Sequence, residues 1–244
     1  MIIFPAIDIR GGRCVRLVEG RFDAETVFAD NPLDMARRWA QEGAEYLHVV
    51  DLDGALAGKP VNTEVIAAIT KAVDIPVQLG GGIRTLESIA VLLDAGVARV
   101  ILGSVAVKQP ELVRQACTKY GDRIVVGIDA RDGQVAVEGW GVSGGVAAEE
   151  LAVKMAAAGV ARIIYTDIAR DGTLTGVNVA ATQSLARAAG IPVIASGGVS
   201  SLDDVTAVKA AQTDGVEGVI IGKALYTGAV KLPEVIRAAR GGER

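Results

Sequence analysis

The chain has 244 residues and a formal net charge of −4 at pH 7. A nucleic-acid-binding surface needs an excess of clustered basic residues, so this acidic balance argues against nucleic acid as a partner. Hydrophobic residues make up 50% of the chain, too many for a disordered protein, yet no run of ~18 uninterrupted apolar residues could span a membrane.

The first residues of the chain, its two cysteines and its single histidine indicate the cellular compartment and exclude some kinds of catalytic site. Residues 1–8 contain no basic segment and already reach Asp8, so they do not resemble a signal peptide. The cysteines Cys14 and Cys117 lie far apart, which suits a reduced compartment, and we expect a cytoplasmic protein. The single histidine, His48, excludes a multi-histidine zinc site and limits any Ser-His-Asp triad to that residue.

Short apolar segments rich in β-branched residues alternate with longer Ala- and Leu-rich segments. Continuous apolarity is typical of strands buried on both faces of a parallel sheet, and the longer segments have the composition of helices. Several of these segments open with a capping residue, such as Asn62, Thr85 or Ser201, and several close on a glycine. The predicted strands are Ile2–Asp8, Tyr46–Asp51, Pro76–Leu79, Arg99–Leu102, Ile124–Asp129, Arg162–Asp167, Pro192–Ala195 and Gly218–Ile221. The predicted helices are Leu33–Gln41, Thr63–Ala72, Leu86–Ala95, Glu111–Tyr120, Ala147–Ala158, Val179–Ala189, Leu202–Ala211 and Leu232–Arg240.

Eight successive strand–helix units suggest a closed α/β barrel. A (β/α)8 barrel averages ~250 residues, which fits the 244 residues of this chain. The alternative, a doubly wound open sheet, would be favoured by a Gly-x-Gly-x-x-Gly motif after the first strand, and that motif is missing. No Pro- or Ser-rich linker separates a second domain, so we predict one (β/α)8 TIM barrel over residues 1–244.

The two halves of the chain repeat each other, which is the signature of a duplicated unit. The aligned segments are 6–12 with 127–133, 43–51 with 159–167, 75–83 with 191–199, and 96–104 with 215–223. Their offsets of 116 to 121 residues are close to half of the chain. We therefore predict two (βα)4 half-barrels, approximately residues 1–121 and 122–244.

Glycines follow the predicted strands at matching places in both halves. A glycine after a strand lets backbone N–H groups approach an anion at a helix N-terminus, and barrels commonly bind phosphate with the loops after strands seven and eight. The repeat predicts a second phosphate site across the barrel mouth, and hence a ligand with a phosphate at each end. The candidate phosphate-binding residues are Gly81, Gly82, Gly103, Ser104, Gly172, Gly176, Ser196, Gly197, Gly198, Gly222 and Lys223.

Two aspartates occupy matching places in the halves. Asp8 ends the first predicted strand and Asp129 ends the fifth, on opposite sides of an eight-stranded barrel. A carboxylate at the end of an apolar strand is costly unless it is used or paired. Two carboxylates that face one ligand can act as general base and general acid. The alternative is that each pairs with the arginine two residues on, Arg10 or Arg131.

Several motifs resemble those of the histidine-biosynthesis barrel family, over essentially the whole chain. They are Pro5-Ala6-Ile7-Asp8, Val15-Arg16-Leu17, the run from Leu47 to Ala55, Gly80-Gly81-Gly82-Ile83-Arg84, Thr166-Asp167-Ile168 with Arg170-Asp171-Gly172-Thr173, Ala195-Ser196-Gly197-Gly198-Val199 and Gly222-Lys223-Ala224-Leu225. The resemblance implies an isomerase that carries out the Amadori rearrangement of a bisphosphorylated phosphoribosylformimino-aminoimidazole carboxamide ribonucleotide. It also implies no metal, no organic cofactor and no obligate protein partner.

The resemblance also implies a role for each site residue. Asp8 is expected to take the proton from ribose C2, and Asp129 to protonate the ring oxygen and open the ring. The expected substrate-binding residues are Arg16, Arg84, Trp140, which could stack on the imidazole carboxamide, and Thr166, which resembles the family's positioning threonine. The polar, glycine-bearing segments Glu19–Phe28 and Val137–Gly145 are expected to close over the site.

Three alternatives remain open from the sequence. The cyclase subunit of imidazole glycerol phosphate synthase shares the half-barrel repeat and both aspartates, but its Pro-Cys-Leu-Asp opening is absent here. A bifunctional isomerase that also acts on phosphoribosylanthranilate needs the same carboxylates, and Gly80 argues against it because that type tends to carry serine there. A non-catalytic sensor of phosphorylated metabolites would gain nothing from paired aspartates.

Overall fold

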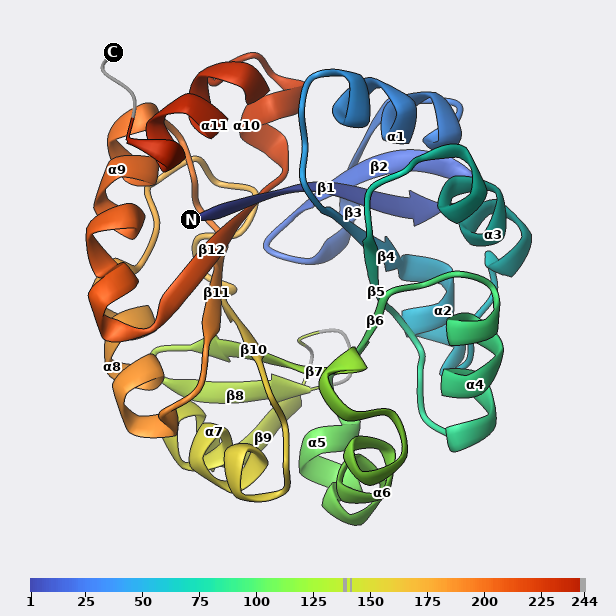
Figure 1. Cartoon of the computed structure of the whole chain (residues 1–244), viewed down its shortest axis with the longest axis vertical. Coiled ribbons are helices and arrows are strands. Elements are labelled where there is room, and N and C mark those ends of the chain that lie inside the picture. The colour runs from blue at the N-terminus through green and yellow to red at the C-terminus, as the bar shows by residue number, and fades with distance from the viewer. Residues whose placement is uncertain (138–139, 141, 242–244) are drawn as a thin grey trace.

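The computed structural model describes residues 1–137, 140 and 142–241. In this part of the chain, eight parallel strands close into a barrel that is ringed by helices (Figure 1), which confirms the predicted (β/α)8 fold. Strand β12 pairs with β1 and β7 pairs with β10, which closes the barrel. The strands are, in order around the barrel, β1 (Ile2–Arg10), β4 (Leu47–Asp51), β5 (Val77–Gly80), β6 (Arg99–Leu102), β7 (Ile124–Arg131), β10 (Ile163–Asp167), β11 (Val193–Ser196) and β12 (Val216–Ile221).

A long outer helix follows each barrel strand. These helices are α1 (Pro32–Gln41), α3 (Thr63–Ala72), α4 (Leu86–Asp94), α6 (Pro110–Tyr120), α7 (Ala148–Ala157), α8 (Val179–Ala189), α9 (Leu202–Ala210) and α11 (Leu232–Arg240). The short helices α2 (Leu52–Ala57), α5 (Val105–Lys108) and α10 (Lys223–Tyr226) follow β4, β6 and β12. The sequence did not predict the short helices, because each is too brief to show a helical period.

Capping residues explain where several helices begin. The Thr85 hydroxyl accepts a hydrogen bond from the Ser88 N–H, and Ser201 forms a capping box with Asp204. Asn62 occupies the N-cap position of α3 as expected, but its side chain makes no capping hydrogen bond. Its side-chain amide donates instead to the carboxylates of Asp51 and Asp53.

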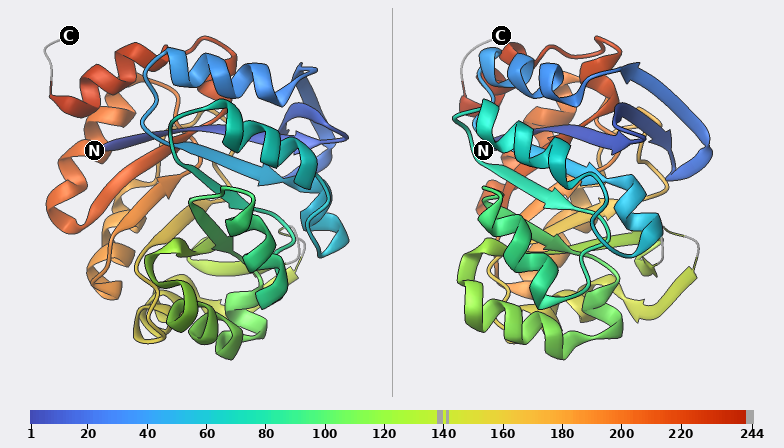
Figure 2. Two further views of the ribbon diagram at one scale, coloured as in Figure 1. Left: turned by 45° about the vertical axis from the view of Figure 1, so that its right-hand side comes forward. Right: turned by 90° about the vertical axis from the view of Figure 1, so that its right-hand side faces the viewer.

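Two antiparallel hairpins extend barrel strands beyond the mouth. One is formed by β1 with β2 (Arg13–Val18) and β3 (Arg21–Ala29), and the other by β7 with β8 (Gln134–Val137) and β9 (Val142–Ala147). Both project from the same end of the barrel (Figure 2). The segment Glu19–Phe28, which we expected to be a lid loop, is mostly strand β3. The other expected lid, Val137–Gly145, includes residues 138, 139 and 141, which lie outside the described residues.

Two hydrophobic clusters pack on the two sides of the barrel wall. The larger lies between strands and helices. The smaller fills the barrel interior, where the rings of Phe4 and Tyr46 lie 5.3 Å apart. Because these side chains fill the interior, a ligand site is left only where the filling stops, at the carboxyl ends of the strands. The remaining members of the inner cluster are Ala6, Ile101, Val125, Ile164, Ile194 and Ile220.

None of the described helices is both long enough and apolar enough to cross a membrane.

Removing the ring of Phe4 should destabilise the barrel strongly. Phe4 is fully buried, so Phe4→Ala is expected to lower the free energy of unfolding by about 3–5 kcal/mol, measured by urea denaturation. Val91 lies exposed on α4, and Val91→Ala should change stability by less than about 0.5 kcal/mol. Equal effects of the two substitutions would contradict the packing described for the barrel interior.

Candidate active site

A cavity of about 250 Å³ opens at the carboxyl ends of the barrel strands. Asp8 on β1 and Asp129 on β7 both line it, from strands on opposite sides of the barrel. The structure therefore brings the two matched carboxylates to one cavity. The predicted substrate-binding residues line the same cavity, namely Arg16, Arg84, Trp140 and Thr166.

Asp8 is held by a buried arginine. Strand β2 places the Arg16 guanidinium against Asp8, with Nη1 and Oδ2 2.8 Å apart. Burial raises the pKa of Asp8 to about 6, while the Arg16 charge acts in the opposite direction. The alternative pairing with Arg10 is wrong, because Arg10 forms an ion pair with Glu25 at 2.6 Å.

Asp129 is held by two hydrogen-bond donors. The indole N–H of Trp140 donates to Oδ2 at 2.8 Å, and the Thr166 hydroxyl, on the adjacent strand, also bonds the carboxylate. Burial raises the pKa of Asp129, and these two hydrogen bonds oppose that shift. The alternative pairing with Arg131 is wrong as well, since Arg131 contacts Glu19 at 3.3 Å.

Trp140 also links the two hairpins. Its indole packs on Gly20 in the turn between β2 and β3, where a Cβ atom would lie 2.1 Å from a ring carbon. Only glycine leaves room for the indole at this contact. The ion pair between Glu19 and Arg131 joins the same two hairpins. Segments far apart in the chain therefore meet at the cavity.

Asp171 is a third, partly buried carboxylate at the cavity, and the sequence did not single it out as a site residue. It lies in the loop after β10, with Oδ1 4.0 Å from Nη2 of Arg16. Burial raises the pKa of Asp171, and the charges of Arg16 and Lys223 lower it. The half-chain repeat could not reveal it, because the equivalent position in the first half is Ala55. The sequence feature that could have pointed to Asp171 is the motif Arg170-Asp171-Gly172-Thr173, which is part of the family resemblance.

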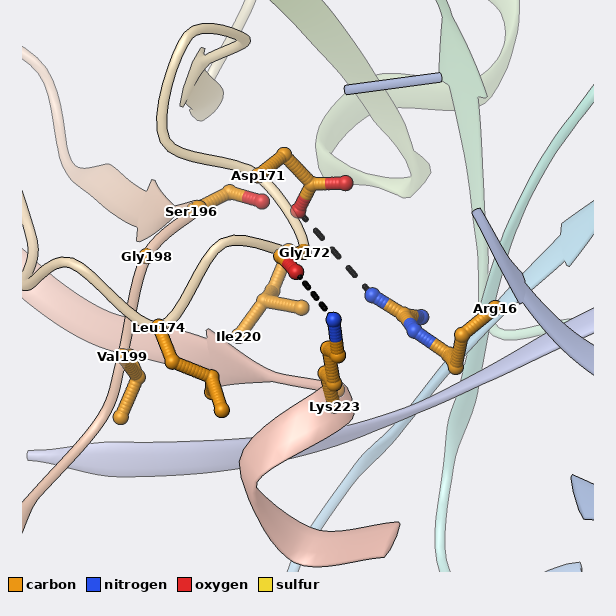
Figure 3. A pocket seen from close by; sticks show the side chains of 11 residues that line it. Arg16, Asp171, Gly172, Leu174, Ser196, Gly198, Val199, Ile220 and Lys223 are labelled. Carbon is orange, nitrogen blue, oxygen red and sulfur yellow. Dashed lines mark hydrogen bonds and ion pairs between the residues drawn. The ribbon is translucent and has the colours of Figure 1, made fainter. Parts of the chain in front are cut away.

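The second half of the barrel forms a small glycine-lined pocket beside the main cavity. Figure 3 shows Lys223 and Arg16 pointing toward the loop that carries Asp171 and Gly172. The ammonium group of Lys223 donates to the Gly172 carbonyl at 2.7 Å. The predicted phosphate-binding residues that line this pocket are Gly172, Ser196, Gly197, Gly198, Gly222 and Lys223.

The first half contributes its predicted phosphate-binding residues to the main cavity. These residues are Gly81, Gly82, Gly103 and Ser104. The backbone packs equally closely in the two halves, because a Cβ on Gly82 would lie 2.1 Å from the Gly54 carbonyl oxygen and one on Gly198 2.2 Å from that of Gly176. Gly176 lines neither pocket, and its N–H donates to the Gly198 carbonyl at 2.9 Å.

A matched aspartate–asparagine pair stands behind each glycine turn. The Asn62 amide donates to Asp51 at 2.7 Å, and the Asn178 amide donates to Asp167 at 2.8 Å. Asp51 also accepts hydrogen bonds from the backbone N–H groups of Gly54, Val61 and Asn62. These carboxylates therefore organise the loops that the glycine turns pack against.

The comparisons with known proteins agree with one another. The family model described as "Histidine biosynthesis protein" matches residues 2–231. The chain is similar to proteins named 1-(5-phosphoribosyl)-5-((5-phosphoribosylamino)methylideneamino)imidazole-4-carboxamide isomerase. The one from Desulforamulus reducens is 59% identical, with 100% of this chain and 99% of the relative covered. Those from Moorella thermoacetica and Geobacter sulfurreducens are 54% and 55% identical, with 100% and 99% of both chains covered.

A side chain at Gly198 should disrupt the glycine turn that we expect to bind phosphate. Gly198→Ala is expected to weaken the binding of ribose 5-phosphate at least tenfold, measured by calorimetry, a loss of about 1.4 kcal/mol. Gly190 also has a positive φ, but a Cβ at this position would meet no atom within 4 Å, so Gly190→Ala tests backbone strain without the clash. Equal loss of affinity in both variants would count against the expected phosphate site.

Proposed function

The chain belongs to the histidine biosynthesis protein family, and we propose that it acts on the substrate for which its relatives are named. It is an isomerase of histidine biosynthesis. Its proposed substrate is 1-(5-phosphoribosyl)-5-((5-phosphoribosylamino)methylideneamino)imidazole-4-carboxamide, which carries two ribose-linked phosphates. The proposed reaction is an Amadori rearrangement that opens one ribose from an aminoaldose to an aminoketose.

One observation carries this proposal. Asp8 and Asp129 come from opposite sides of the barrel to the same cavity, and the cavity lies between the glycine turns of the two halves. A substrate with a phosphate at each end would place its middle, where the reacting ribose lies, between the carboxylates. Acid–base chemistry requires the reacting groups to be within hydrogen-bond reach of the proton they transfer.

We propose Asp8 as the general base that removes the proton from ribose C2. A base must be ionised before it can accept a proton, and a pKa of about 6 leaves most Asp8 molecules ionised at neutral pH. The same raised pKa makes Asp8 a stronger base than an exposed aspartate. The Arg16 guanidinium, 2.8 Å away, orients the carboxylate and keeps its pKa from rising further.

We propose Asp129 as the general acid that protonates the ribose ring oxygen. Protonation breaks the bond between this oxygen and C1, and the electron pair of the nitrogen on C1 replaces that bond, which leaves a protonated imine. Loss of the C2 proton to Asp8 then gives a neutral enaminol, which becomes the aminoketose when a proton moves from its hydroxyl group to C1. The raised pKa of Asp129 supports this role, since an acid must carry a proton. Asp171 is the second candidate, because burial also raises its pKa and it lines the same cavity.

The remaining residues are proposed to hold the substrate. Lys223 and the glycine turns of the second half would bind one phosphate, and Arg84 with the glycine turns of the first half would bind the other. Thr166 would position the ribose beside Asp129, and Trp140 would stack on the imidazole carboxamide. We also propose that the enzyme acts in the cytoplasm without nucleic acid or an obligate protein partner.

Neutralising the carboxylates should separate their roles. Asp8→Asn and Asp129→Asn are each expected to lower turnover by ~10²–10⁴-fold, because each removes a proton-transfer group. The measurement is a spectrophotometric isomerase assay with the proposed substrate. Asp171→Asn in the same assay decides between the two candidate acids, and the residue whose loss lowers turnover more is the acid.

Circular dichroism and substrate binding of each variant provide the control for folding. Near-normal turnover in both Asp8→Asn and Asp129→Asn would contradict the mechanism. Absence of turnover by the wild-type protein would contradict the proposed substrate.

The pH dependence of the reaction should report on Asp8. Because the base works only when ionised, kcat/KM is expected to fall as the pH decreases through about 6. The Arg16 charge lowers the pKa of Asp8, so Arg16→Met should shift this fall in kcat/KM to higher pH. The measurement is kcat/KM across the pH range for both proteins. If kcat/KM falls at the same pH in Arg16→Met, another group controls the pH dependence.

A further inference from the structure

His48 and Gln78 form a polar contact inside an otherwise apolar part of the barrel. They are register partners on β4 and β5, and the Gln78 Nε2 lies 3.1 Å from the His48 Nδ1. Gln78 has no exposed surface, whereas His48 lines the main cavity. The mechanism described above uses neither residue.

The repeat shows that packing does not require this polar pair. The equivalent residues in the second half are Ile164 and Ile194, which are also register partners, on β10 and β11. Both isoleucines belong to the hydrophobic cluster that fills the barrel interior. Since two isoleucines fill the equivalent space, the polar pair in the first half needs another explanation.

The contact indicates which imidazole nitrogen carries the proton. When the Gln78 amide N–H donates to Nδ1, that nitrogen is the acceptor and the proton lies on Nε2. In this orientation the Gln78 Nε2 has a partner, and the Gln78 Oε1 has none among the described residues. The reversed amide would leave its buried N–H₂ group without this acceptor, and unpaired buried donors are rarer than unpaired acceptors. Because Gln78 engages Nδ1, the nitrogen that remains for a ligand is Nε2.

The surroundings of His48 keep the ring neutral. Burial, followed by the charge of Arg16, lowers the pKa of His48 to about 3. The ionisable groups around the same cavity include Arg16 and the carboxyl groups of Asp8, Asp129 and Asp171. His48 therefore offers an uncharged N–H donor in the same cavity as these carboxyl groups.

We propose that the Nε2–H of His48 donates a hydrogen bond to an oxygen of the reacting ribose, and that Gln78 is the positioning residue that selects this tautomer. The inference rests on the proposed function, because that function places a ribose in the cavity. Four other residues that line the same cavity, Ala6, Ile101, Ile164 and Ile220, have no polar side-chain atom. His48 is thus one of the polar side chains of this cavity that could orient a ribose oxygen.

The single histidine makes the tautomer directly measurable. Protein labelled with ¹⁵N-histidine gives imidazole signals from His48 alone, because no other histidine is present. We expect a neutral ring with the proton on Nε2, unchanged between about pH 5 and pH 8, where an unperturbed histidine would titrate. A proton on Nδ1, or titration in this range, would overturn the proposal without any measurement of activity.

Binding tests the contact with the substrate. The probe is the proposed substrate added to ¹⁵N-labelled Asp8→Asn protein, which should bind it with little turnover. A shift of the Nε2 and attached proton signals at saturation is expected. Saturation without such a shift would overturn the contact. Absence of turnover by the wild-type enzyme would instead remove the proposed function, and the tautomer result would stand by itself.

A double-mutant cycle tests whether Gln78 acts through His48. Gln78→Ile should give a mixture of tautomers and lower kcat about tenfold, with a smaller change in KM. In the His48→Ile background the same substitution should have little further effect, because the residue it positions is gone. The double variant reproduces the isoleucine pair of the second half, so we expect it to fold.

A matched control lies at the equivalent position of the other half. Ile194→Val changes the barrel interior without touching His48, and it should leave the histidine signals unchanged and kcat within about twofold. If Gln78→Ile lowers kcat equally with and without His48, the positioning role is wrong. Retention of the Nε2–H tautomer in Gln78→Ile would also overturn it.

Discussion

The candidate site depends on one buried guanidinium. Arg16 is 7% exposed and lies 2.8 Å from Asp8 and 4.0 Å from Asp171. Without this positive charge, the carboxylates of Asp8 and Asp171 would be largely buried near each other with no compensation, which proteins seldom tolerate. The backbone makes room for it, because the guanidinium occupies the space that a Cβ on Gly222 would need. The same group thus orients the proposed base and opposes the rise in its pKa that burial causes.

The half-barrel repeat supplies the frame, and departures from the repeat supply much of the chemistry. Matched positions in the two halves supply the carboxylates of Asp8 and Asp129, the close-packed glycine turns, and the aspartate–asparagine pairs behind those turns. The unmatched positions are Asp171 against Ala55, Lys223 against Ser104, His48 against Ile164, and Gln78 against Ile194. A symmetric barrel can hold a ligand with two similar ends, but proton transfer in one direction needs two unlike sides.

Much of the fold was predictable, because its signals are local. The apolar runs, the capping residues and the glycines after helices locate the barrel strands and long helices to within two residues. The hairpins were missed, since Arg21–Ala29 is a half-exposed strand with a polar composition typical of a loop. The sequence predicts that Asn62 caps α3, and Asn62 takes the N-cap position, but its amide donates to Asp51 and its side chain makes no capping hydrogen bond.

The sequence by itself determined the closed barrel, its duplicated halves and the placement of Asp8 and Asp129 on opposite strands. These features follow from periodicity and from the rule that parallel strands end at the same edge. Only the tertiary structure decided that Arg16 rather than Arg10 contacts Asp8, that Trp140 donates to Asp129, and that Gln78 engages His48. Side-chain partners depend on the direction in which each residue leaves its strand and on burial, which chain spacing does not specify.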